Sequence, residues 1–174
     1  FVNSLVLGPD GKRIVSSSGD NTIKVWDTET GTEVMNIPIT DGNVVSCVAM
    51  SPDGKRIVSG GGSREIPVIN VWDATSGKEL MILRGHNGMI NSIAFSPNGK
   101  RIISGSEDDK LIKLWDTKTG AEVMSLRGDK DGGHFVAFSP DGKCIIWTDG
   151  GEIKFWDTNT FKELMTIHAY EDFV

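Results

Sequence analysis

The sequence predicts an all-β fold built from four similar units, each a four-stranded antiparallel sheet. Three observations support this prediction. A Pro-Asp/Asn-Gly-Lys turn signature occurs four times, a Trp-Asp signature follows each turn, and the units keep a nearly constant length along the 174 residues. The turn prolines lie 43, 45 and 43 residues apart, at Pro9, Pro52, Pro97 and Pro140. Such a period indicates an array of related supersecondary units.

The third unit shows most clearly why four strands are expected. Residues 90–96 read INSIAFS, a run rich in β-branched and aromatic residues that ends at a Pro-Asn-Gly turn. Three further short runs follow at 100–106, 111–116 and 121–128, again separated by turn residues. In the first turn Pro sets φ, and the Gly after Asn or Asp accepts the positive φ of a tight hairpin. Four such strands in about 43 residues are typical of one propeller blade.

An aspartate directly after the repeated Trp is expected to hold the next turn in each unit. Its carboxylate can accept hydrogen bonds from backbone amides of that turn, which a glycine closes in the first three units. The four aspartates are Asp27, Asp73, Asp116 and Asp157. The fourth unit has Phe161 at the glycine position. Its turn must therefore differ or carry strain.

Composition excludes several classes of partner. The net charge is −6, and the 18 Lys and Arg residues form no dense cluster, so nucleic acid is not an expected partner. No apolar run approaches the roughly 20 residues that span a bilayer, and no signal peptide is present, so no membrane is expected either. Two Cys are too few for a disulfide framework, which favours a cytoplasmic or other intracellular setting.

The order of these signatures resembles that of the WD-repeat β-propeller family over essentially the whole chain. The third unit, from Gly-His at 85–86 through Ser-Pro-Asn-Gly-Lys and Ser-Gly-Ser to Leu-Trp-Asp, matches most closely. The resemblance implies a ring of usually seven or eight blades that serves as a rigid platform for protein partners. The repeat spacing divides a single propeller segment, 1–174, into blades of about 1–43, 44–88, 89–131 and 132–174.

The resemblance also implies a buried His–Ser/Thr–Asp–Trp hydrogen-bond network in each blade. The third blade can supply all four groups, with either Asp108 or Asp109 as the carboxylate. The first blade lacks the His, the second lacks the Asp, and the fourth has Trp147 in place of the serine. The third blade is therefore expected to be the stiffest. The network residues are Ser16, Asp20, Trp26, Ser59, Trp72, His86, Ser104, Asp109, Trp115 and Trp156.

The candidate partner-binding residues lie mainly in the loops between the second and third strands, where most of the length variation occurs. In the family these loops and the links between blades share one face, the usual partner-binding face. Their acidic character predicts a docking surface for a basic or polar partner, and a solvated rim is the alternative. Trp147 is either a core filler or an aromatic anchor near that face. The candidates are Asp20, Arg64, Glu65, Glu107, Asp108, Asp129, Trp147 and Asp149.

No catalytic residue, metal ligand or cofactor site is expected. Ser and Asp recur at turn positions in every unit, as a structural role predicts. The three His residues show no short ligand spacing, and the Gly-rich stretch 60–63 lacks the Lys-Ser/Thr of a phosphate loop. The sequence thus predicts a non-catalytic protein-interaction platform. The alternatives are binding of a small molecule or glycan in the channel and a purely structural, ring-closing role.

Four blades would fill about half of a ring of seven or eight. Both end blades would then leave an apolar face uncovered, and large exposed apolar patches usually mark an interface. Because closed twofold dimers are the commonest homo-oligomers, we expect two chains to complete an eight-bladed ring. The alternative is that the missing blades belong to a longer parent chain.

Overall fold

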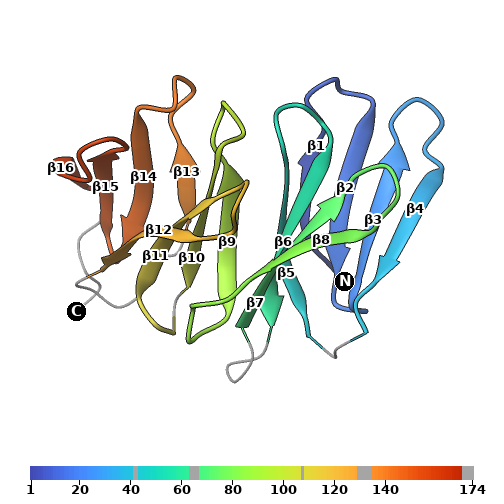
Figure 1. Cartoon of the computed structure of the whole chain (residues 1–174), viewed down its shortest axis with the longest axis horizontal. Helices are drawn as coiled ribbons and strands as arrows, with labels where there is room; N and C mark the ends of the chain where they lie inside the picture. Colours follow the sequence, from blue (N-terminus) through green and yellow to red (C-terminus); the bar gives the residue numbers. More distant parts are fainter. Residues whose placement is uncertain (41–42, 63–66, 107, 129–134, 170–174) are drawn as a thin grey trace.

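The fold consists of four separate four-stranded sheets. The computed structural model describes residues 1–40, 43–62, 67–106, 108–128 and 135–169. In every sheet the strands pair antiparallel in chain order, so each sheet is a local meander (Figure 1). We call the sheets blades 1 to 4 in chain order. This arrangement confirms the predicted all-β fold. No helix in the described ranges is long and apolar enough to cross a membrane.

The strands have five to seven residues each, except β13, which has three. Blade 1 contains β1 (Val2–Leu7), β2 (Arg13–Ser18), β3 (Thr22–Asp27) and β4 (Glu33–Pro38). Blade 2 contains β5 (Val45–Met50), β6 (Arg56–Gly62), β7 (Pro67–Asp73) and β8 (Glu79–Leu83). Blade 3 contains β9 (Ile90–Phe95), β10 (Arg101–Ser106), β11 (Leu111–Asp116) and β12 (Glu122–Arg127). Blade 4 contains β13 (Val136–Phe138), β14 (Cys144–Asp149), β15 (Glu152–Asp157) and β16 (Glu163–His168).

The turn between the first two strands has the predicted backbone conformation in all four blades. Its glycine adopts a left-handed φ of 70° at Gly11, 68° at Gly54, 67° at Gly99 and 70° at Gly142. A residue with a Cβ pays a steric cost in this conformation, so the repeated glycine is explained by the turn. The Pro-Asp/Asn-Gly signature therefore sets the hairpin that starts every blade.

The turn after the Trp-Asp signature keeps its shape in blade 4 and carries the strain. Phe161 has a φ of 54°, and its N–H donates to the Asp157 carbonyl over 3.0 Å, as the glycines at this place do in the other blades. Its side chain packs against the core between blades 3 and 4. That packing offsets part of the cost of a left-handed bulky residue.

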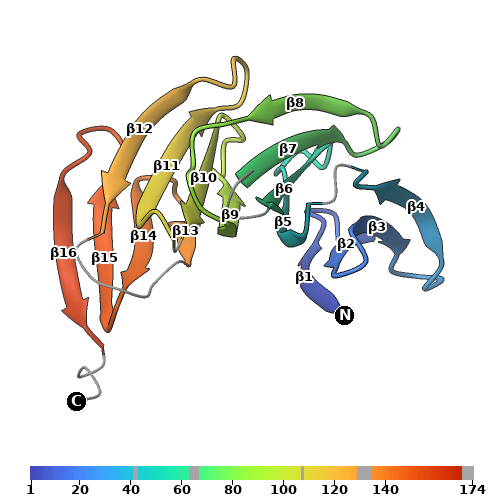
Figure 2. The same cartoon turned by 90° about the horizontal axis from the view of Figure 1, so that it is seen from below.

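The four blades are arranged in an arc (Figure 2). The first strand of each blade lies on the concave side of the arc and the last strand on the convex side. Three hydrophobic cores lie between consecutive blades and join them. At each of these joints the repeated Trp of the later blade contacts the earlier blade, as Trp72, Trp115 and Trp156 show. The arc leaves one face of blade 1 and one face of blade 4 without a neighbouring blade.

Candidate functional site

The most complete polar site of the chain lies inside blade 3. The indole Nε1–H of Trp115 donates to Ser104 Oγ over 2.8 Å, and the same oxygen lies 2.8 Å from His86 Nε2. The other ring nitrogen, His86 Nδ1, lies 2.9 Å from Asp109 Oδ2. The sequence left open whether Asp108 or Asp109 is the carboxylate of the network, and the structure shows that it is Asp109. Ser104 is completely buried, and the His86 and Trp115 side chains are almost completely so.

The charge state of this network follows from its geometry. Burial by itself would raise the pKa of Asp109, but hydrogen bonds from the His86 ring and the Asn87 amide outweigh it and hold the pKa below its ordinary value. An ionised carboxylate only accepts hydrogen bonds, so the proton of a neutral His86 ring lies on Nδ1. Nε2 then accepts from the Ser104 hydroxyl, whose oxygen accepts from Trp115. All four side chains are satisfied.

The network also fixes the two connections that meet at this edge of the blade. Asp109 Oδ2 accepts from the Asn87 amide over 2.8 Å, and Asp109 Oδ1 accepts from the Leu111 amide over 2.9 Å. The neighbouring Asp108 Oδ2 accepts from the Met89 amide over 3.2 Å. The link that enters blade 3 and the loop between β10 and β11 are thereby tied together. Asn87 and Asp108 lie exposed on this rigid pair of connections.

Among the described residues, blades 1 and 2 contain only the Trp–Ser part of the network. Trp26 Nε1–H donates to Ser16 Oγ and Trp72 Nε1–H donates to Ser59 Oγ, each over 2.9 Å. Asp20 is exposed and bonds within its own turn, where Oδ1 accepts from the Thr22 hydroxyl over 2.6 Å. That hydrogen bond lowers the pKa of Asp20. Asp20 therefore does not join the Trp26–Ser16 pair.

Blade 4 replaces the hydrogen bond by aromatic stacking. Trp147 stands where the other blades have the serine, and its ring stacks on Trp156 with centroids 5.5 Å apart and planes 19° from parallel. Trp156 Nε1 is buried and has no acceptor among the described residues. Asp149 is 3% exposed and its carboxylate lies 2.8 Å from Lys154 Nζ. Blade 4 thus keeps the fold with a different interior.

The predicted partner-binding residues fall into three groups. Asp20 and Asp108 are exposed, as a docking role requires. Trp147, at 1% exposed, is buried as in the core-filler alternative, and the burial of Asp149 corrects the expectation that its side chain faces a partner. The remaining candidates lie outside the described residues: Arg64, Glu65, Glu107 and Asp129.

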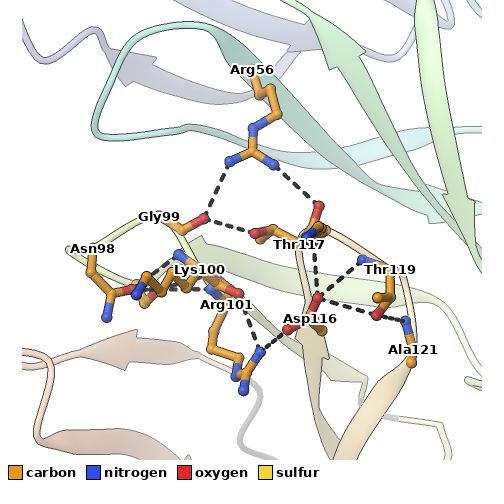
Figure 3. A network of polar contacts seen from close by, with 11 residues as sticks. Arg56, Asn98, Gly99, Lys100, Arg101, Asp116, Thr117, Thr119 and Ala121 are labelled. Carbon is orange, nitrogen blue, oxygen red and sulfur yellow. Dashed lines mark hydrogen bonds and ion pairs between the residues drawn. The ribbon is translucent and has the colours of Figure 1, made fainter.

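Sequence reasoning missed two arginines that fasten one blade to the next, and Figure 3 shows the contact of one of them, Arg56. Arg56, at the start of β6, donates to the carbonyls of Thr117 and Gly99 in blade 3 over 3.2 and 3.3 Å. Arg13, at the start of β2, donates to the Ala74 carbonyl in blade 2 over 3.2 Å. We call this contact the arginine clasp. The repeated Lys-Arg-Ile after the first turn was its signal in the sequence, although the third copy, Arg101, pairs with Asp116 of its own blade (Figure 3).

A second missed feature is a lysine two residues before the repeated Trp. Lys113 is buried and its Nζ lies 2.7 Å from Glu122 in the next strand, and Lys24 pairs with Glu33 over 2.6 Å. These pairs tie the third strand of a blade to its fourth. Among the described residues, no group of three or more His, Cys, Asp or Glu is placed to hold a metal ion.

Comparison with known proteins identifies the family. The model of the WD domain, G-beta repeat, matches residues 1–27, 32–73 and 77–116. The chain belongs to the WD-repeat family. The matched WD-repeat segments reach from β1 to β11, whereas β12 and blade 4, which has lost the serine and the turn glycine, lie beyond them.

Three WD-repeat relatives show how much of a larger protein the chain represents. It is 28% identical over 82 residues to the DENN domain and WD repeat-containing protein SCD1 of Arabidopsis thaliana, a match that covers 47% of this chain and 7% of SCD1. The structure of U3-55K superposes with a TM-score of 0.84 at 26% identity, over 96% of this chain and 51% of that one. The RRP9 WD40 repeats superpose with a TM-score of 0.82 at 27% identity, over 94% and 50%. The chain thus spans about half the length of these solved structures.

Proposed function

We propose that this WD-repeat segment is a non-catalytic platform for a protein partner. The observation that carries the proposal is the rigid pair of connections at one edge of blade 3. The buried network holds both in place, and Asn87 and Asp108 project from them into solvent. Preorganised polar groups bind with less loss of conformational entropy than mobile ones do. WD-repeat propellers are generally interaction scaffolds, which agrees with this role.

The geometry of the network supports a structural rather than a catalytic use of its residues. Ser104, His86 and Asp109 are connected in the order of a hydrolase triad. In such a triad, however, the serine oxygen must reach a substrate carbonyl. Here Ser104 is completely buried and its oxygen already accepts from Trp115. The three groups that could activate a serine nucleophile instead hold the connections of blade 3 in place.

The partner that suits this edge carries basic or polar groups. Asp108 contributes exposed negative charge in blade 3, and Asp20 does so at the corresponding loop of blade 1. Hydrogen bonds within its turn lower the pKa of Asp20, so this carboxylate stays ionised at neutral pH. Opposite charge on the partner would raise the association rate and fix its orientation.

The test is affinity capture with two matched variants. Asp108→Asn removes the charge but keeps an oxygen for the Met89 amide. Asp10→Asn makes the same change at the opposite edge, where Asp10 Oδ1 accepts from the Lys12 amide. A partner of the proposed edge is captured by the parent chain and by the Asp10 variant, and its binding to the Asp108 variant is weaker. Equal binding by both variants would refute the proposed edge.

We also propose that two chains form an eight-bladed ring with twofold symmetry. The arc ends on two open blade faces, and the chain covers about half of the solved WD-repeat structures it matches. Light scattering should then give a mass of about twice the 18.9 kDa of one chain. A folded species of 18.9 kDa at every concentration would refute the ring of two chains.

A further inference from the structure

The three joints inside the chain bury the same positions each time. In the first strand of blades 2, 3 and 4, Val48, Ile93 and Val136 face the preceding blade and are 6, 7 and 7% exposed. The strand register places Leu5 at the same position of blade 1. Leu5 is 67% exposed. Blade 1 therefore carries one half of a joint that has no partner within the chain.

Blade 4 carries the other half. In the fourth strands, Ile37 and Leu83 face the following blade and are 4 and 2% exposed, whereas Ile167 at the same register of β16 is 41% exposed. Met165 lies two residues earlier on the same side and is 48% exposed, although the corresponding methionine of blade 1 packs into a joint. The open face of blade 4 thus carries apolar side chains at the positions that the following blade covers at the internal joints.

The open face of blade 1 extends beyond Leu5 along the same positions. Leu7 is 57% exposed, and Ile14 and Trp26 are half-buried, although their counterparts in blades 2 and 3 are fully or largely buried in joints. The two open faces lie at opposite ends of the arc (Figure 2). Within one chain they do not meet. A second copy brings blade 1 of one chain to blade 4 of the other at both ends, which closes a symmetric interface.

The arginine clasp is missing at the edge of blade 4. Arg13 and Arg56 each cross to the next blade, Arg101 pairs with Asp116 of its own blade, and Cys144 occupies this position at the start of β14. A cysteine cannot supply the two-pronged donor of a guanidinium. The carbonyls that a clasp from blade 4 would reach in the next copy correspond to those of Thr28 and Gly11, because Arg56 bonds Thr117 and Gly99 at these positions of blade 3.

We infer that the open faces of blades 1 and 4 join two copies of this chain in the register of the internal joints, with Leu5, Leu7 and Trp26 of one copy under β16 of the other. Cys144 leaves this joint weaker than the joints that a clasp fastens. The inference rests on the proposed ring of two chains and adds to it the residues of the seam.

The test installs the missing clasp in the full chain. Cys144→Arg should lower the dissociation constant of the dimer about tenfold relative to Cys144→Ala, because each joint gains hydrogen bonds from a charged donor to the Thr28 and Gly11 carbonyls. Cys144→Lys is the matched control, since it adds the positive charge without the planar guanidinium that donates to two carbonyls at once. Sedimentation equilibrium over a range of protein concentrations measures all three constants.

A second variant keeps the inference testable if the arginine disturbs folding. Leu5→Glu places a charge on a side chain that is 67% exposed in the single chain, so it should leave folding intact and abolish the dimer. A dimer that persists in this variant would overturn the proposed seam. A dimer that forms equally well with alanine and arginine at position 144 would overturn the role of Cys144 alone. A monomer in all variants would refute the ring itself, and the capture experiment with Asp108 would be unaffected.

The thiol of Cys144 provides an independent readout at the seam. Its alkylation rate in the parent chain should fall as the protein concentration passes through the dissociation constant, because the second copy covers it. Cys47 is buried inside the joint between blades 2 and 3 and serves as the internal reference. An alkylation rate of Cys144 that does not depend on concentration, in a protein that sediments as a dimer, would place the interface elsewhere.

Discussion

Replacement of Ser104 by alanine removes the centre of the blade 3 network. The hydroxyl bonds two buried groups, the Trp115 indole N–H and the His86 Nε2, each over 2.8 Å. An unpaired buried polar group costs about 1–3 kcal/mol, so the variant should lose about 2–6 kcal/mol of unfolding free energy. Loss of one oxygen atom leaves too little space for a water molecule to replace it. This loss is a large share of the about 5–15 kcal/mol that stabilises a typical domain.

The same substitution in blade 1 is the matched control. Ser16 accepts one hydrogen bond, from Trp26, which is only half-buried and has no histidine partner. In the monomer, water can reach this indole when the hydroxyl is removed. At protein concentrations below the dissociation constant of the dimer, Ser16→Ala should therefore cost no more than about 1 kcal/mol. Urea unfolding followed by circular dichroism gives both free energies. Equal losses in the two variants, or a loss below about 1 kcal/mol for Ser104→Ala, would refute the idea that the complete network makes blade 3 the most rigid.

Three further predictions concern turns, acid and thiols. Gly31→Ala should cost only the left-handed backbone conformation, about 1–2 kcal/mol, because its φ is 70° and no atom lies within 4 Å of the added Cβ. Gly120→Ala should cost more in the same thermal melt, because the added Cβ would also lie 2.7 Å from a methionine sulfur of blade 2. Hydrogen bonds from the backbone amides of its turn lower the pKa of Asp116 to about 2, so its contribution to stability is complete above pH 4 and disappears as the pH falls toward 2. The difference in urea midpoint between the parent chain and Asp116→Asn should shrink over this range, and a constant difference would contradict the assignment. Burial raises the pKa of the Cys47 thiol to about 12, so a thiol reagent at pH 7 should label Cys144 and leave Cys47 unlabelled until the protein unfolds.

The strands, turns and blades were readable from the sequence because short-range physics determines them. A glycine that must adopt positive φ and an aspartate that caps the following turn act over fewer than six residues, and both recur with the repeat. The strain at Phe161 followed from the same reasoning, since a bulky residue stands where the other units have glycine. The Trp–Ser hydrogen bonds were implied by the resemblance to WD repeats, and they are present in blades 1, 2 and 3.

The tertiary structure decided which of these residues are buried and which contacts cross between blades. Trp147 and Asp149 lie at the end of β14, and both are buried because the neighbouring blade covers the tryptophan and Lys154 pairs with the aspartate. The arginine clasp joins residues 61 positions apart, a separation at which the repeat shows only that an arginine recurs. The sequence by itself thus determined four blades and their turns. Only the packing of one blade on the next showed that equivalent residues differ in burial, since the exposure of a side chain depends on the surface placed opposite it.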